Sequence, residues 1–192
     1  MVYADYAATY PYIKYSSSAY GPFLNPNANY AYKEKRLLSE AENRIKKAIG
    51  AKGGKVVFGG ISSQLVENLM MAIDEATNYR HMICSSFEHD SCFRYGQVIG
   101  YSKEDLFNKL QIAREYIAEA QTFIMWMGVN NITGEIFPVT EIGTACHEHD
   151  AFYICDATAM IGHAAIPENI DKWCNAFIMD GHKLGTELGI GA

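Results

Sequence analysis

The residues with the clearest chemical potential lie in segment 175–192, which reads NAFIMDGHKLGTELGIGA. Its apolar run, 176–179, is typical of a buried strand, and Asp180, His182 and Lys183 come soon after it. At the exit of a buried strand, desolvation can lower the pKa of an amine, and a neutral amine is a nucleophile for carbonyl groups. The segment is therefore compatible with a reactive lysine, although these residues alone favour an ordinary surface lysine after a strand.

A second chemical feature is the pair of hydroxyl residues Ser62 and Ser63. They follow the apolar run 55–58 and a glycine turn, and they precede a predicted helix over 64–77. The unpaired amides of a helix N-terminus attract anions, and serine hydroxyls add hydrogen-bond donors. The pattern has what a phosphate site needs, although a plain helix N-cap is the favoured interpretation of these residues alone.

Three further polar residues, His89, Asn131 and Asp156, come just after predicted strands. In open α/β sheets, ligands bind beyond the carboxyl ends of the strands. We therefore expect these residues, the two serines and the pair 182–183 to meet at one rim. The structural alternatives are a helix cap for His89, a turn former for Asn131 and an N-cap for Asp156.

The elements that must position these residues alternate along the chain. The predicted strands share short apolar runs and are 55–58, 81–84, 97–100, 123–129, 152–155 and 177–179. The predicted helices share amphipathic patterns and are 29–49 with a stop at Gly50, 64–77, one beginning at 102–105, 112–120 and 139–149. This alternation predicts an α/β fold with a mostly parallel sheet covered by helices on both faces. Residues 1–28 are expected to form an irregular arm and 29–192 a single domain.

The composition narrows the class of protein. The chain of 192 residues has a net charge of −6, which predicts neither a nucleic-acid partner nor an anionic membrane partner. Its 5 cysteines are scattered, with no CxxC spacing, and are expected to be reduced thiols in a cytoplasmic protein. The apolar run 123–129 is too short to span a bilayer, and no basic region of a signal peptide opens the sequence.

The segment 146–150, CHEHD, consists of residue types that bind metals. Adjacent ligands at a helix end do not converge on one tetrahedral ion, however. A solvated helix terminus is the favoured interpretation, and no metal site is predicted.

Several segments match one family in order along the chain. They are residues 3–9 (YADYAAT), 25–27 (NPN), 57–58 with 62–64, Glu88-His89, 129–131 (VNN) with Gly134, Pro138 and 141–143 (EIG), 156–158 (DAT), and 182–183 with 189–192 (GIGA). In these segments the chain resembles the large domain of the NifS-like cysteine desulfurases. That family lies in the class V aminotransferase branch of the fold-type I pyridoxal-phosphate enzymes.

The resemblance implies roles at the ring end of a pyridoxal 5'-phosphate cofactor. Lys183 would bind the cofactor covalently through its amine, and Asp156 would pair with the pyridine nitrogen. His89 would stack on the ring and relay protons, which makes it the second catalytic candidate. Asn131 would donate a hydrogen bond to the phenolic oxygen.

At the phosphate end, the resemblance implies that Ser62, Ser63 and His182 hold the phosphate group. Several positions depart from the family, including Tyr6, the segment 186–188 and the two that follow. Asp180 stands where the family has a serine that touches the phosphate, and Ala159 stands where a glutamine supports the phenolic oxygen. A carboxylate at position 180 would repel the phosphate unless it is turned away or protonated.

The implied reaction converts L-cysteine to L-alanine and leaves sulfur bound to the enzyme. The family's enzymes are longer, and their second half carries the small domain, the substrate-binding arginine and the sulfur-accepting cysteine. We therefore expect a truncated large domain without turnover of its own. The resemblance also implies a homodimer and a sulfur-acceptor protein. Another class V enzyme (an aminotransferase or selenocysteine lyase) and a non-catalytic binding module remain alternatives.

Overall fold

The computed structural model describes residue 29 and residues 31–76, 80–95, 97–99, 105, 108, 121–186 and 191–192. The predicted arm 1–28 and the predicted amphipathic segment 112–120 lie outside the described residues. Nearly all of the helix predicted to begin at 102–105 lies outside them as well.

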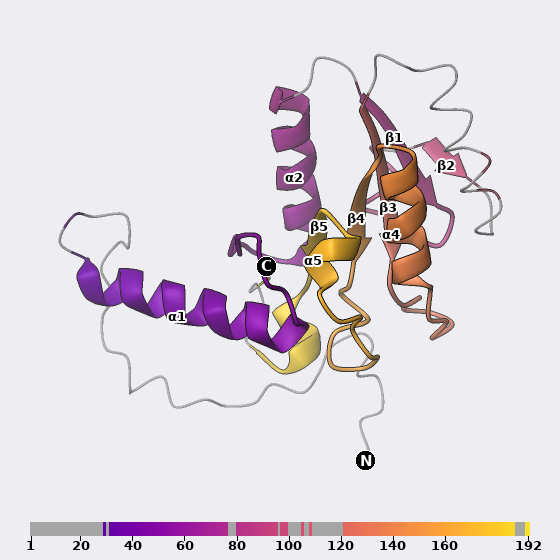
Figure 1. The fold of residues 1–192 in the computed structure, drawn as a ribbon. Helices are drawn as coiled ribbons and strands as arrows, with labels where there is room; N and C mark the ends of the chain where they lie inside the picture. The colour runs from indigo at the N-terminus through magenta and orange to yellow at the C-terminus, as the bar shows by residue number, and fades with distance from the viewer. Residues whose placement is uncertain are drawn as a thin grey trace.

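The centre of the fold is a five-stranded sheet in the order β2-β1-β3-β4-β5 (Figure 1). Its strands are β1 (Arg80–Ser85), β2 (Gln97–Ile99), β3 (Gln121–Met127), β4 (Phe152–Asp156) and β5 (Ala176–Ile178). Every neighbouring pair is parallel. The predicted α/β class and parallel sheet are therefore confirmed, with β3 ending two residues earlier than predicted.

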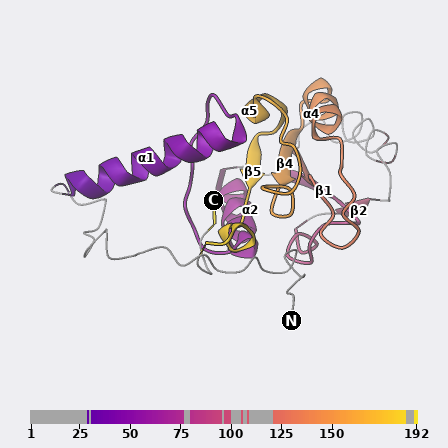
Figure 2. The same ribbon diagram turned by 90° about the horizontal axis from the view of Figure 1, so that it is seen from below.

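Helices cover both faces of this sheet, as Figures 1 and 2 show. α2 (Ser62–Ala76) lies on one face, and α4 (Val139–Glu148) and the short α5 (Ile170–Trp173) lie on the other. Successive side chains of β3 alternate between the two layers: Phe123 packs in the cluster that includes α2, and Ile124 in the cluster that includes α4. This two-sided burial is why the strands read as continuous apolar runs.

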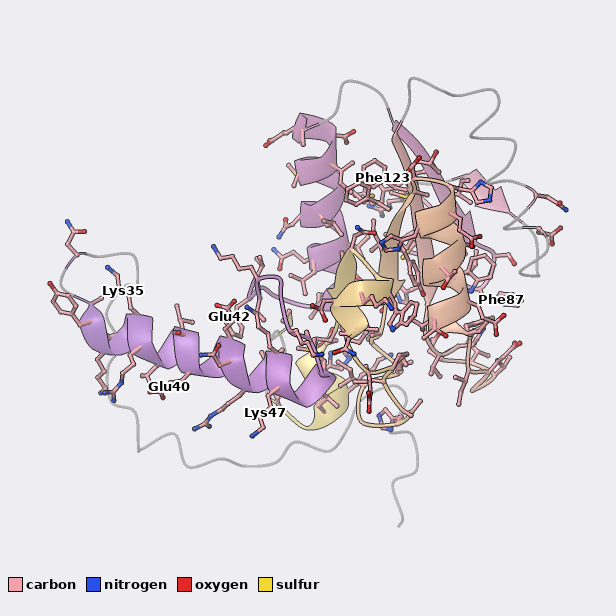
Figure 3. All side chains as sticks on the ribbon, in the orientation of Figure 1. Lys35, Glu40, Glu42, Lys47, Phe87 and Phe123 are labelled. Carbon is pink, nitrogen blue, oxygen red and sulfur yellow. The ribbon has the colours of Figure 1, made fainter. Side chains whose placement is uncertain are left out.

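α1 (Tyr32–Ile49) begins near the predicted residue and ends at Gly50, whose φ of 70° is left-handed, as the glycine stop predicts. Figure 3 shows the exposed side chains of Lys35, Glu40 and Lys47 projecting from this helix. Its C-terminal end contacts the rest of the domain, because Ile49 packs against the core on the α4 side of the sheet. Within the described residues, no helix combines the length and apolar character needed to cross a membrane.

The strand predicted over 55–58 is wrong. Val57 is 67% exposed and Phe58 39% exposed. A strand needs a pairing partner for its backbone, but the Val56 amide donates to the Glu42 side chain at 3.3 Å. Among the described residues, pairing next to this run is limited to one bridge, between Gly59 and Gly191.

Candidate active site

A pocket of about 290 Å³ lies at the carboxyl ends of the strands. It brings together all the residues that sequence reasoning assigned to a site, namely Ser62, Ser63, His89, Asn131, Asp156, His182 and Lys183. Its remaining lining residues are Ile61, Met127, Val129, Thr158, Ala159 and Asp180. The predicted convergence at one rim is therefore observed.

The sheet register explains this convergence. β3 and β4 pair so that their last residues, Met127 and Asp156, are partners, and Asp156 pairs in turn with Ile178 at the end of β5. His89 lies in the turns that follow β1, and Lys183 lies in the 3₁₀ helix η2 (Gly181–Leu184) that follows β5. Parallel strands in register thus deliver four separate chain segments to one edge.

Asp156 is one of two buried carboxyl residues that line the pocket, at 7% exposure; the other is Asp180, at 1%. The Oδ1 of Asp156 accepts a hydrogen bond from the Thr158 amide at 2.9 Å, and residues 158–163 form turns, so this bond stabilises a turn and the N-cap alternative is wrong. The described residues offer Asp156 no ion pair, and the buried Thr158 hydroxyl beside it has no hydrogen-bond partner. A buried carboxylate and an unpaired hydroxyl in one pocket suit a polar ligand with a cationic or N–H group.

Glu88 lies behind Asp156 and is 5% exposed. Its Oε1 accepts hydrogen bonds from Ser85 Oγ at 2.6 Å and from the Met127 amide at 2.7 Å, whereas Oε2 is buried without a partner. Burial, together with the nearby charge of Asp156, raises the pKa of Glu88 to about 7. Sequence reasoning quoted Glu88 only as part of a motif and gave it no role.

Glu88 also belongs to a compact buried group with Asp156 and Cys92, whose potential ligand atoms lie within 4.8 Å of one another. Burial raises the pKa of the Cys92 thiol far above its ordinary value. The group therefore presents a neutral thiol, whereas metals bind the thiolate.

The start of α2 is capped by a residue from the other end of the chain. The Ser62 amide donates to Asp180 Oδ2 at 2.9 Å. Asp180 is 1% exposed, and its Oδ1 accepts from the His182 amide at 3.1 Å and contacts His182 Nδ1. The carboxylate that departs from the family pattern thus points at the helix N-terminus, and is not turned away from it.

The exposed residues His89 and Asn131 complete the rim. His89 accepts a hydrogen bond from the Ser91 amide at Nδ1, which also meets Ser91 Oγ at 2.9 Å. The turn after β3 is held by Asn130, whose Oδ1 accepts from the amides of Ile132 and Thr133. Because Asn130 supports the turn, Asn131 is left to face the pocket.

The segment 146–150 does not gather into one ligand set. Cys146 is fully buried in the core, where burial raises its pKa to about 12. His147 Nδ1 meets the Gly143 carbonyl at 3.1 Å, one turn back along α4. Only Cys146 belongs to the core. His147, Glu148 and Asp150 are exposed, so the end of the helix is largely solvated, as the sequence favoured.

Comparisons with known proteins agree with this geometry. A family model described as aminotransferase class-V matches residues 3–192. The chain is 30% identical over 210 residues to cysteine desulfurase IscS of Dictyoglomus turgidum, covering 100% of this chain and 53% of that protein. Thus the chain spans about half the length of the curated relatives it matches.

Solved structures share the fold. A NifS-like protein from Rickettsia africae aligns with a TM-score of 0.76 and 20% identity, covering 100% of this chain and 57% of that one. The structure of SspA in complex with cysteine aligns with a TM-score of 0.71 and 24% identity, covering 97% and 59%. The fold is therefore that of the fold-type I pyridoxal-phosphate enzymes.

The pocket fits the cofactor of these enzymes at its ring end. The buried Asp156, the unpaired Thr158 hydroxyl and the Lys183 side chain all line one cavity. The phosphate end has the α2 N-terminus and two serines, with Asp180 as the one conflicting group. With the family model covering residues 3–192, these observations establish that the chain belongs to the class V aminotransferase family, whose members depend on pyridoxal phosphate.

Proposed function

We propose that residues 29–192 form the cofactor-binding large domain of a pyridoxal-phosphate-dependent, cysteine desulfurase-like protein. The proposed reaction takes sulfur from L-cysteine and leaves L-alanine and enzyme-bound sulfur. The observation that carries the proposal is that Lys183 and Asp156 line the same pocket, although 27 residues separate them in sequence. The relatives named cysteine desulfurase and the neighbour solved with cysteine support the choice of substrate.

In this proposal the ring end is held by three side chains. Lys183 holds the cofactor through its amine, Asp156 neutralises a cationic ring nitrogen, and Asn131 donates to a ring oxygen. When bound, pyridoxal phosphate supplies an electron-withdrawing ring that stabilises negative charge on the substrate carbon. The apolar side chains of Met127 and Val129 exclude water from one wall of the pocket.

The proton-handling residue of the proposal is His89. Because Nδ1 accepts a hydrogen bond from the Ser91 amide, the neutral ring carries its hydrogen on Nε2, and Nε2 is the nitrogen that can donate a proton to a bound ligand. Its position on the exposed rim supports exchange of that proton with solvent.

Sulfur acceptance needs a reactive thiolate. All five cysteines of the chain are described and buried, and none of them lines the pocket. We therefore propose that residues 1–192 alone form no persulfide when given L-cysteine, and that sulfur passes to a thiol of another segment or of an acceptor protein. Mass spectrometry that finds a persulfide on this chain would refute this.

The experiment that tests the function is cofactor titration. Wild-type protein mixed with pyridoxal phosphate is expected to develop visible absorbance, and borohydride reduction followed by peptide mass spectrometry is expected to locate the label on Lys183. Lys183→Ala should remain colourless, whereas Lys172→Ala, which changes a lysine on α5, should behave like wild type. A wild-type protein that stays colourless would favour the non-catalytic binding module.

We also propose that the chain is cytoplasmic and acts as a homodimer. Exposed apolar side chains beside the pocket support a dimer: Ile132 is 87% exposed and Ile136 65% exposed in the hairpin after β3. Sedimentation velocity should show a dimer for wild type and for Ile132→Val, and a monomer for Ile132→Asp.

A further inference from the structure

The α2 N-terminus already has an anion. A helix of 15 residues begins at Ser62, and its first amide donates to the Asp180 carboxylate at 2.9 Å. This is the position at which the free amides and the macrodipole of a helix attract a negatively charged ligand. The carboxylate thus uses the donor that a bound phosphate would use.

Asp180 is held in this place from several sides. Its backbone pairs with Gly191, and its side chain accepts from the His182 amide as well as from the Ser62 amide. The packing leaves no spare room, since a Cβ at Gly191 would lie 2.3 Å from the Gly60 carbonyl oxygen. At 1% exposure, the carboxylate cannot swing into solvent without breaking these contacts.

The same pocket still offers unused polar groups. The buried Thr158 hydroxyl has no partner, and Ser63 lines the cavity as well. These groups suit hydroxyl or ether oxygens, which are uncharged. A phosphate dianion would instead have to share Ser62 and His182 with a second anion in a partly desolvated site.

Resting on the proposed function, we propose that Asp180 sets the cofactor specificity of this pocket by taking the place of the ligand's anionic group. The pocket accordingly takes unphosphorylated pyridoxal about as well as pyridoxal phosphate. The ring end, with Lys183 and Asp156, then supplies most of the affinity.

Equilibrium titrations followed by visible absorbance test this inference. For wild type, the dissociation constants of pyridoxal and pyridoxal phosphate are expected to agree within about threefold. Asp180→Ser keeps an N-cap residue at this position and should shift the ratio of the two dissociation constants at least about tenfold in favour of pyridoxal phosphate. A matched control is Asp171→Ser, which removes another amide-capping carboxylate that does not line the pocket.

Inorganic phosphate gives a second readout that needs no pyridoxal. It should raise the melting temperature of Asp180→Ser and leave that of wild type unchanged. The inference is overturned if wild type binds pyridoxal phosphate at least about tenfold more tightly than pyridoxal and Asp180→Ser binds pyridoxal phosphate no more tightly than wild type does. That result leaves the proposed function intact. If neither aldehyde binds either protein, the proposed function and the cofactor specificity fail together, and the phosphate measurement still reports what Asp180 does at the helix.

Discussion

Two buried carboxyl groups, Glu88 and Asp156, lie side by side at the carboxyl end of the sheet. Only Asp156 lines the pocket, while Glu88 fixes the end of β3 through the Met127 amide. The pKa of Glu88 is raised to about 7 by its burial and by the nearby charge of Asp156, so Glu88 keeps its proton below neutral pH and loses it as the pH rises above 7.

The Glu88 carboxyl should make stability depend on pH. Its folded pKa of about 7 exceeds its ordinary value of 4.5, so between these values the folded chain keeps a proton that the unfolded chain releases. The free energy of unfolding therefore falls as pH rises through this window, by roughly 2–3 kcal/mol between pH 5 and 8. Glu88→Gln should remove this dependence and be favoured over wild type at pH 8.

Urea denaturation of both proteins at pH 5 and pH 8 measures this difference. Gln keeps an oxygen for Ser85 and Met127, and its amide can donate towards Asp156. Glu135→Gln, which changes an exposed carboxyl, is the control and should follow wild type at both pH values. Parallel pH dependence in wild type and Glu88→Gln would contradict the assignment.

At the scale of elements, the sequence predicted the five strands and the helices α1, α2 and α4, because their apolar periodicity reflects burial directly. The strand predicted over 55–58 was wrong because an apolar run can lie beside a sheet without forming backbone hydrogen bonds with its strands. The cap on α2 was beyond sequence reasoning, since Asp180 is 118 residues from Ser62. Glu88 was missed for a similar reason: its partners lie on β1 and β3, and nothing local indicates that it is buried.

The packing of α4 against α5 depends on a glycine. A Cβ at Gly143 would lie 2.2 Å from the Trp173 carbonyl oxygen and 2.9 Å from the carbonyl carbon. Gly143→Ala should therefore destabilise the protein by about 1–3 kcal/mol through overpacking, although alanine is the better helix former.

Thermal or urea denaturation of Gly143→Ala tests this contact. The neighbouring exposed substitution Thr144→Ala should change stability by no more than about 0.5 kcal/mol. A stabilised Gly143→Ala would mean that helix propensity outweighs the close approach to α5.

At the scale of the whole molecule, residues far apart in sequence meet because parallel strands deliver every following turn to one edge of the sheet. The order of the strands, more than any local motif, makes the site. This is why scattered single residues such as His89 and Asp156 could be grouped before the structure was known, whereas their hydrogen-bond partners could not.

Backbone hydrogen bonds connect three chain segments next to the phosphate end of the pocket. Gly191 exchanges backbone hydrogen bonds with Gly59, and Ala192 exchanges them with Met179, next to Asp180. Gly191→Ala, whose Cβ would lie 2.8 Å from Leu65 Cδ1, should lower the free energy of unfolding by about 1–3 kcal/mol. Absorbance titration should show weaker pyridoxal binding in the same variant, whereas Ala192→Gly, which keeps the backbone bonds, should bind normally.

Gly191 has no side chain and does not line the pocket, yet it sets the spacing between the first turn of α2 and the lysine-bearing turn η2. A substitution that disturbs the backbone contacts of Gly191 is therefore expected to weaken cofactor binding before it disrupts the pairing between strands of the sheet.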